Sequence, residues 1–301
     1  MELTILGCGS AIPLPSRGAS AQIIRIDQEN ILIDCGEATQ IQLRTFKVRL
    51  QQITTVLISH MHGDHYFGLP GLINSMQLLG RTAPLTIYGP EALEAWIKMS
   101  LQASYTRLRF SLNFFVTSYG KAEVIVDHKK YTITSFPLKH QIPTTGFRIQ
   151  EKQKPAHMRG ELVKELNIPH YLIDGIKKGD DYTTEDGRKI PHRQLTRPAA
   201  HPKSYAYCSD TKYDENIVQH IAGVNVLYHE STFLEALSAR AKKTFHSTAL
   251  EAATIAKKAN VKRLILGHFS ARYKELDDFI VEAKLMFDNV SVAFDGMVEQ
   301  I

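Results

Sequence analysis

The chain has 301 residues, of which 44% are hydrophobic and 22% are charged. This composition is that of an ordinary globular protein, so it excludes disorder as the main state and allows one large domain or two smaller ones. The formal charge of +5 permits an anionic partner such as nucleic acid but does not require one.

Short apolar runs bounded by glycine or polar residues predict buried β-strands. They lie at residues 2–7, 21–26, 30–34, 54–59, 85–89, 131–136, 204–210, 224–230, 263–268 and 290–296. Helical patterns separate them at residues 37–47, after Leu69, and at 90–103, 248–260 and 274–287. Pro90 heads one of these helices, and Thr248 with Glu251 forms a capping box at another. The mixture predicts an α/β (α+β) fold of two stacked sheets covered by helices.

Residues 151–193 interrupt this pattern because they are polar, highly charged and poor in strand signals. One interpretation is a solvated surface insertion. The other is an arm that grips a large partner, since long insertions in compact domains are often functional.

The three cysteines, Cys8, Cys35 and Cys208, are sparse and form no CxxC pair, which argues against a disulfide framework. The N-terminal segment MELTILGCGSAIP lacks the basic region and long apolar run of a signal peptide. No apolar run reaches the roughly 18 residues that a membrane span needs. We therefore expect a cytoplasmic protein that does not enter a membrane.

The stretch LISHMHGDHYFGL, residues 57–69, places His60, His62, Asp64 and His65 directly after a predicted strand. Residues two apart at a strand end point the same way, so His60 and His62 can converge on one ion. After the turn at Gly63, Asp64 and His65 can face a second ion. Imidazole and carboxylate ligands without cysteine suit Zn²⁺, with Mn²⁺ or another divalent ion as an alternative.

Two ions need more ligands than this segment supplies. Three candidates follow other apolar runs, namely His140 after TITSFPLK, Asp210 after SYAYCS and His268 after RLILG. Each of these residues alone is more often structural than a ligand. Together they supply the further ligands that two ions need in addition to His60, His62, Asp64 and His65.

These segments resemble blocks of the ribonuclease Z family, which processes tRNA 3′ ends and belongs to the metallo-β-lactamase superfamily. SHMHGDH is similar to the HxHxDH signature of that superfamily. The blocks that narrow the resemblance to the family occur in its order along essentially the whole chain: LGCGSAIP, LIDCGEATQIQL, SHMHGDHYFGLPGL, KHQIPTTGFRI, YCSDT, HEST at 229–232, HST at 246–248 and LGHFSARY.

The resemblance implies the metallo-β-lactamase fold, a four-layer αββα sandwich of two mixed sheets, as a single domain over residues 1–301. It implies two Zn²⁺ per subunit. Seven ligands are implied. One ion would be held by His60, His62 and His140, and the other by Asp64, His65 and His268. Asp210 would bridge the two ions. A hydroxide between the ions would attack the scissile phosphorus, with Asp64 as general base.

For catalysis, the resemblance implies that His246 protonates the leaving 3′ oxygen and that Glu230 raises its pKa. His229 is expected to be structural. The products would be tRNA with a 3′-hydroxyl and a trailer with a 5′-phosphate. The partners implied are precursor tRNA and a second copy of the chain in a homodimer.

The insertion at 151–193 matches the position of the family's flexible tRNA-binding arm. Its candidate phosphate contacts are Lys164, Lys177, Lys178 and Arg188. The family's Gly-Pro pair is replaced there by Pro169-His170-Tyr171.

Two other blocks also depart from the family pattern. Near the N-terminus, PLPSRG retains Pro13 and Arg17 of a block associated with the CCA end, which makes Arg17 a further candidate RNA contact. Ala38 stands where the family has glycine in DCGEGTQ, and we interpret this change as minor.

Two alternatives keep parts of this interpretation. A metallo-β-lactamase-fold phosphodiesterase or other hydrolase of a small substrate would use the same ions, but it gains little from a long charged insertion. A non-catalytic tRNA-binding protein would not need the complete ligand set. The leading prediction is therefore a zinc-dependent endoribonuclease that removes 3′ trailers from precursor tRNA.

Overall fold

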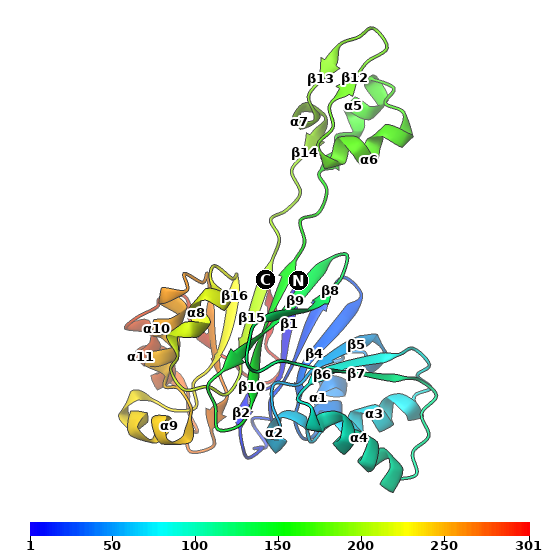
Figure 1. Ribbon diagram of the computed structural model, residues 1–301. Helices are drawn as coiled ribbons and strands as arrows, with labels where there is room; N and C mark the ends of the chain where they lie inside the picture. Colours follow the sequence, from blue (N-terminus) through cyan, green and yellow to red (C-terminus); the bar gives the residue numbers. More distant parts are fainter. The chain divides into compact units, whose positions relative to one another are not determined.

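The computed structural model describes all residues from Met1 to Ile301. The chain forms two compact units (Figure 1). Unit 1 contains residues 1–127, 133–149 and 203–301, and unit 2 contains residues 128–132 and 150–202.

Two seven-stranded sheets form the centre of unit 1 (Figure 1). The first has, in spatial order, β20 (Val298–Gln300), β1 (Glu2–Gly7), β3 (Ala21–Ile26), β4 (Glu29–Cys35), β5 (Ile53–Leu57), β6 (Leu85–Gly89) and β7 (Leu112–Val116). The second has β19 (Val290–Val292), β17 (Leu264–Gly267), β16 (Val226–Glu230), β15 (Ser204–Cys208), β10 (Thr144–Glu151), β9 (Tyr131–Leu138) and β8 (Glu123–Asp127). The run from β4 to β7 is parallel, as is the run from β15 through β16 and β17 to β19.

Helices cover the outer faces of both sheets (Figure 1). The first sheet is covered by α1 (Thr39–Thr45), α3 (Leu69–Leu78) and α4 (Ala92–Ala103), and the second by α8 (Val218–Ile221), α10 (Ala249–Lys258) and α11 (Asp277–Lys284). Short elements complete the unit: β2 (Gly9–Ser10), α2 (Gly63–Tyr66), α9 (Ser238–Thr244), β18 (Phe269–Ser270), η1 (Leu50–Gln52), η2 (Glu215–Ile217) and η3 (Glu235–Leu237). None of the helices has the length and apolar composition that crossing a membrane requires.

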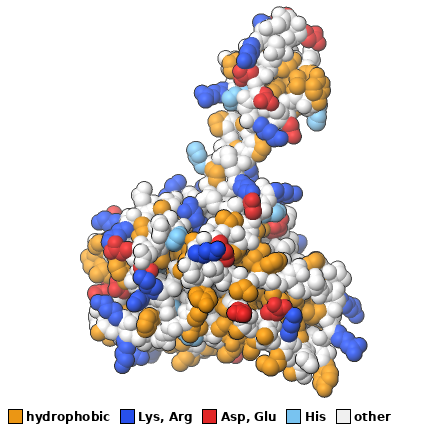
Figure 2. Space-filling view, viewed as in Figure 1, with side chains coloured by type: hydrophobic (Ala, Val, Ile, Leu, Met, Phe, Trp, Pro, Cys, Tyr) orange, Lys and Arg blue, Asp and Glu red, His pale blue; other side chains and the backbone are white.

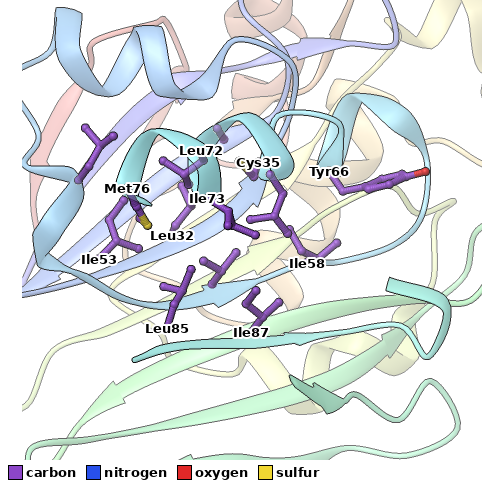
Figure 3. Close-up of a cluster of buried hydrophobic side chains, with 14 of the residues drawn as sticks. Leu32, Cys35, Ile53, Ile58, Tyr66, Leu72, Ile73, Met76, Leu85 and Ile87 are labelled. Atoms are coloured by element: carbon purple, nitrogen blue, oxygen red, sulfur yellow. The ribbon is translucent and has the colours of Figure 1, made fainter. Parts of the chain in front are cut away.

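A cluster of buried apolar side chains joins the first sheet to its helices (Figure 3). Leu32, Ile53 and Ile87 come from the strands, and Leu72 and Met76 come from α3. Burying each such side chain contributes about 1.5–3 kcal/mol, so this cluster fixes the strand ends that carry the site.

Buried tyrosines on β15 connect the two sheets. Tyr205 donates a hydrogen bond to the Gln22 side chain on β3, and Tyr207 donates one of 2.7 Å to Asp34 on β4. A buried hydroxyl is costly without a partner, so these pairs fix how the two sheets face each other.

The predicted architecture of two mixed sheets flanked by helices is confirmed. The ten predicted strand regions and five helical regions all contain elements of the predicted type. Within the two large sheets, four strands were not predicted: β7, β8, β10 and β20. In β7 and β8 most side chains are partly or fully exposed on both faces, so these edge strands lack the buried apolar run that identified the others.

Unit 2 is a small folded body with its own core. It contains α5 (Gly160–Glu165), α6 (His170–Lys178), α7 (His192–Leu195) and two strand pairs, β11 (His157–Met158) with β14 (Thr196–Arg197) and β12 (Tyr182–Thr183) with β13 (Lys189–Ile190). Its buried side chains are Ile168, Ile176, Tyr182 and Leu195. Figure 2 shows Lys and Arg side chains on its surface. The expected insertion at 151–193 lies within this unit, and its role as an RNA-binding arm stays a prediction.

Candidate metal centre

The candidate site lies where several strands of the two sheets end. Asp210 follows β15, Glu230 is the last residue of β16, and His268 follows β17. Since these three strands are parallel neighbours, their carboxyl ends share one edge of the second sheet. From the same sheet, His140 follows β9.

The first sheet contributes the segment after β5. His60 and His62 lie between β5 and α2, whereas Asp64 and His65 lie within the single turn of α2. The His65 ring lies beside the His60 ring, with centroids 4.2 Å apart, and Asp64 and His65 group with His268.

The first ligand set contains His60, His62, His140 and Asp210. His62 Nδ1 lies 3.1 Å from His60 Nε2 and 3.1 Å from His140 Nε2. Asp210 Oδ2 lies 3.7 Å from His60 Nε2 and 3.6 Å from His140 Nε2. A tetrahedral zinc ion with bonds of about 2.0–2.1 Å holds its ligands roughly 3.3 Å apart, so these atoms have the spacing of one such shell.

The second ligand set contains Asp64, His65 and His268. His65 Nε2 and His268 Nε2 are 3.3 Å apart, and each lies 3.5 Å from Asp64 Oδ2. Asp210 Oδ1 approaches the same two nitrogens at 3.4 Å and 3.1 Å. The second set therefore has the same spacing as the first.

Asp210 connects the two sets because its two oxygens face different ligands. Its Oδ1 is buried and has no hydrogen-bond partner, although His268 Nε2 lies only 3.1 Å away. A buried acceptor without a donor costs about 1–3 kcal/mol, and more when it is charged. A cation between the ligands would remove this cost. The residues therefore fit two divalent cations with Asp210 between them.

Asp34 is a fully buried carboxylate that holds His65 from behind. It accepts hydrogen bonds from His65 Nδ1 at 2.7 Å, from Tyr207 at 2.7 Å, and from the backbone and side chain of Ser59 at 2.8 and 2.9 Å. With the Nδ1 proton donated to Asp34, the lone pair on His65 Nε2 is free for a metal ion. Asp34 was not among the predicted site residues, although it ends an apolar run as Asp210 does.

Three further imidazoles are held through Nδ1 in the same way. This leaves their Nε2 atoms directed at the ligand sets. The pairs are His60 with Ser59 Oγ at 2.9 Å, His140 with the Phe245 carbonyl at 2.9 Å and His268 with Thr232 Oγ1 at 3.0 Å.

The protonation of the ligands follows from burial and charge. Burial lowers the pKa of His60 and of His140, which favours the neutral form that a metal ion needs. Burial alone would also lower the pKa of His65, but the surrounding Asp64, Asp210 and Asp34 outweigh it and raise that pKa. These three carboxylates thus favour a positive charge between them, which either a protonated imidazole or a metal cation can supply.

His246 and Glu230 form a pair beside the ligand sets. His246 Nδ1 lies 2.8 Å from Glu230 Oε1 and 4.0 Å from Asp210 Oδ2. Burial alone would lower the pKa of His246, but the buried Glu230 carboxylate raises it to about 9. Because Nδ1 is held by Glu230, Nε2 is the nitrogen left for a substrate. Neighbouring His229 is buried and its Nδ1 donates to the Glu230 carbonyl at 2.7 Å, while its Nε2 has no hydrogen-bond partner, and its structural role stays a prediction.

Several of the candidate ligands line a cavity of about 570 Å³. Its polar lining includes Glu37, Gln141 and His246, and its apolar lining includes Pro13 and Phe67. This volume is within the usual range of small-molecule sites.

The loop after β2 closes one side of this cavity and contacts the second ligand set. The Ala11 backbone N–H donates to Asp64 Oδ2 at 2.7 Å, which fixes that carboxylate. Neither Ala11 nor Phe67 was among the predicted site residues.

Arg17 lies in the same loop, but its side chain does not line the cavity. It is only 6% exposed, it donates to the Tyr273 carbonyl oxygen, and it lies over the Phe269 ring. The structure thus gives Arg17 a structural contact between two loops, and RNA binding by Arg17 stays a prediction.

The other predicted RNA contacts lie in unit 2. Lys164, Lys178 and Arg188 are exposed, and Arg188 pairs with Asp186 at 2.7 Å. Lys177 and Lys178 line a hollow of about 360 Å³ together with His192 and Arg193.

Comparison with known proteins places the chain among metal-dependent nucleases. The family model described as anti-Pycsar protein Apyc1 matches residues 1–154. A ribonuclease Z of Phocaeicola vulgatus is 45% identical over 292 residues, which cover 97% of this chain and 94% of that protein. A ribonuclease Z of Parabacteroides distasonis is 42% identical over 98% of this chain and 97% of its own length. The chain belongs to the ribonuclease Z family.

Solved structures agree with this membership. The short form of human tRNase Z superposes with a TM-score of 0.73 at 29% identity, covering 100% of this chain and 99% of that one. The Bacillus subtilis metallo-β-lactamase fold protein YhfI, at 20% identity and a TM-score of 0.70, supports the fold alone. The predicted fold and the prediction of a ribonuclease Z-type hydrolase are confirmed, and the roles of single residues stay predictions.

Proposed function

We propose that this ribonuclease Z family member is a zinc-dependent endoribonuclease that removes the 3′ trailer from precursor tRNA. The observation that carries the proposal is the geometry of the two candidate ligand sets. Asp210 approaches both sets, and the nitrogen and oxygen atoms that could bind metal lie 3.1–3.7 Å apart. It is supported by relatives named ribonuclease Z that align over nearly the full chain.

The chain's own side chains would divide the work as follows. His60, His62 and His140 would hold one Zn²⁺, and Asp64, His65 and His268 would hold the second. Asp210 lies next to both sets and would serve both ions. When bound, the two ions supply Lewis acidity that stabilises charge on the phosphate and lowers the pKa of water.

Asp64 orients the attacking water molecule and accepts its proton. Burial by itself raises the pKa of Asp64, but His65 and His268 lower it far below its ordinary range, so Asp64 is ionised at neutral pH. The Ala11 N–H occupies one side of Oδ2, which limits the directions from which water can approach.

His246 donates a proton through Nε2 to the leaving 3′ oxygen of the tRNA. Glu230 is buried and accepts hydrogen bonds from the Thr211 N–H at 3.0 Å and the Thr232 N–H at 2.9 Å, so it cannot turn away from His246. A positioned acid of this kind contributes about 10²–10⁴-fold to the rate.

The proposal includes three further properties. The tRNA body would bind unit 2, where Lys164, Lys177, Lys178 and Arg188 offer charge to phosphates. The enzyme would act as a homodimer, as the family resemblance implies. It would work in the cytoplasm on newly made precursor tRNA.

Cleavage of a 3′-extended precursor tRNA by the purified protein tests this function. We expect a cut at or near the discriminator nucleotide, which is lost with a chelator and in Asp64→Ala. As a comparison, the same preparations are given bis(p-nitrophenyl) phosphate. Turnover of this small diester without any tRNA cleavage would retain the metal site but overturn the substrate, in favour of a small-molecule hydrolase.

A further inference from the structure

Phe67 is an aromatic side chain exposed at the candidate active site. It lines the cavity that holds Asp64 and His246, and 55% of its surface is accessible. Its neighbour Tyr66 is buried by contrast, since only 7% of it is accessible, and belongs to the core cluster in Figure 3. Of two consecutive aromatic residues, the fold thus buries one and presents the other beside the ligand sets.

The structure holds the Phe67 ring in place from behind. It stacks on Trp96 with ring centres 6.0 Å apart and planes at 27°, and Tyr66 packs at 4.9 Å. It also lies against the Gly63 backbone, where a Cβ atom would come within 2.2 Å of the ring. Gly63, which stands between His62 and Asp64 in the sequence, therefore leaves room for this ring.

Single exposed aromatic residues are ordinary on protein surfaces, so the feature that singles out Phe67 is its place. It is the one Phe, Tyr or Trp side chain among the residues that line the cavity with the ligand sets. In a cavity that binds a phosphodiester, the flat apolar group next to the phosphate is a nucleobase. Aromatic side chains stack on unpaired bases with little dependence on sequence, because every base has a π face. Pro13 and Ala11 add apolar surface to the same cavity.

We propose that Phe67 is a stacking platform for the first nucleotide of the trailer, immediately 3′ of the cut. This inference rests on the proposed function. His246 would protonate the oxygen that stays on the tRNA, and it follows α9 on the second-sheet side of the site. Phe67 follows α2 on the first-sheet side, so the nucleotide across the scissile phosphate from His246 is the one that reaches it.

A double-mutant cycle between enzyme and substrate tests this contact. Wild-type protein and Phe67→Ala are each given precursor tRNA with either a normal or an abasic first trailer nucleotide. We expect either single change to lower kcat/KM about 5- to 150-fold, which is 1–3 kcal/mol of stacking converted at 25 °C. Both changes together should cost little more than one, because they remove the same contact.

Three controls separate stacking from a structural role. Phe115 is 52% exposed, stacks on Tyr88 and lies outside the cavity, so Phe115→Ala should cleave both substrates as wild type does. Phe67→Trp should retain the preference for a normal base. Phe67→Ala should bind as much zinc as wild type and remain folded at the assay temperature, although loss of the Trp96 and Tyr66 contacts lowers its thermal midpoint.

If Phe67→Ala acting on the abasic substrate loses kcat/KM by the product of the two single effects, the stacking site is overturned. The proposed function would remain intact. The stacking site is also overturned if an abasic discriminator nucleotide, and not the first trailer nucleotide, couples to Phe67. If the wild type cuts no precursor tRNA at all, the proposed function fails first and the stacking site fails with it.

Discussion

Replacing Asp34 by asparagine tests whether the ligands are held by the carboxylate behind them. Asp34 Oδ2 accepts three hydrogen bonds and Oδ1 accepts one, from the Ser59 backbone N–H at 2.8 Å. In Asp34→Asn, the amide oxygen would take the place of Oδ2 because it satisfies more donors. The amide NH₂ would then face the Ser59 N–H, so two donors would meet.

The expected cost has two parts. A buried N–H without an acceptor costs about 1–3 kcal/mol of folding stability. Loss of the negative charge behind His65 also makes its Nε2 a weaker ligand, and changes of this kind weaken metal affinity about 10- to 100-fold. That factor corresponds to roughly 1.4–2.7 kcal/mol of binding free energy.

Competition with a chromogenic zinc chelator measures the affinity, and chemical denaturation of the metal-free proteins measures the stability. Asp174→Asn, an exposed aspartate of unit 2, is the matched control and should change neither. Asp34→Asn with wild-type zinc affinity would refute the reasoning, because the carboxylate would then not influence His65.

Three other changes follow from the same geometry. His246→Ala should lower the rate of tRNA cleavage about 10²- to 10⁴-fold in steady-state assays. Hydrolysis of bis(p-nitrophenyl) phosphate should be unaffected, because its leaving group needs no proton, and equal losses on both substrates would contradict an acid role. Thr232→Val removes the acceptor at His268 Nδ1, so the affinity for one of the two zinc ions should fall about 10- to 100-fold in chelator competition. Removing zinc from the wild type should lower its free energy of unfolding by about 2.7 kcal/mol per site, relative to free zinc at 100 times Kd; an unchanged denaturation midpoint would mean that the ligands hold no ion.

The metal ligands could be predicted from sequence because each has a local signal. Four of them lie within six residues, and His140, Asp210 and His268 each follow an apolar run that reads as a strand. The ends of neighbouring strands in a layered fold meet at one edge of the sheet. The residue type and its position after a predicted strand were therefore sufficient to identify the candidate ligands.

The roles of the residues that support these ligands depend on contacts far away in the sequence, so an acid that ends an apolar run, as Asp34 does, could not be assigned a partner. Asp34 accepts from Tyr207, 173 positions later, and no local pattern shows this contact. Phe67 reads like any aromatic residue near a helix start, since only packing decides that Tyr66 turns into the core and Phe67 into the cavity. The core of unit 2 was also missed, because its apolar residues, such as Ile168 and Leu195, are dispersed among charged and polar ones instead of forming a strand-like run.

Ala38 shows a sequence change that is not as minor as its chemistry suggests. It precedes α1 in the left-handed conformation, with φ of 65°, at a position where the family resemblance leads us to expect glycine. An L-residue pays about 1–2 kcal/mol for that conformation, and the Ala38 methyl group is exposed, so packing offsets little of this cost.

Ala38→Gly should therefore stabilise the protein. The gain is reduced by about 0.5–1 kcal/mol because glycine is freer in the unfolded chain. This leaves a net increase in the free energy of unfolding of roughly 0–1.5 kcal/mol, about 0.75 kcal/mol at the middle of both ranges. Ala95→Gly makes the same exchange at an exposed position inside α4, where ordinary helix propensity predicts a loss of about 1 kcal/mol. Urea denaturation of the two variants should thus shift in opposite directions, and a shift of both toward lower urea would show that the backbone at Ala38 carries no strain.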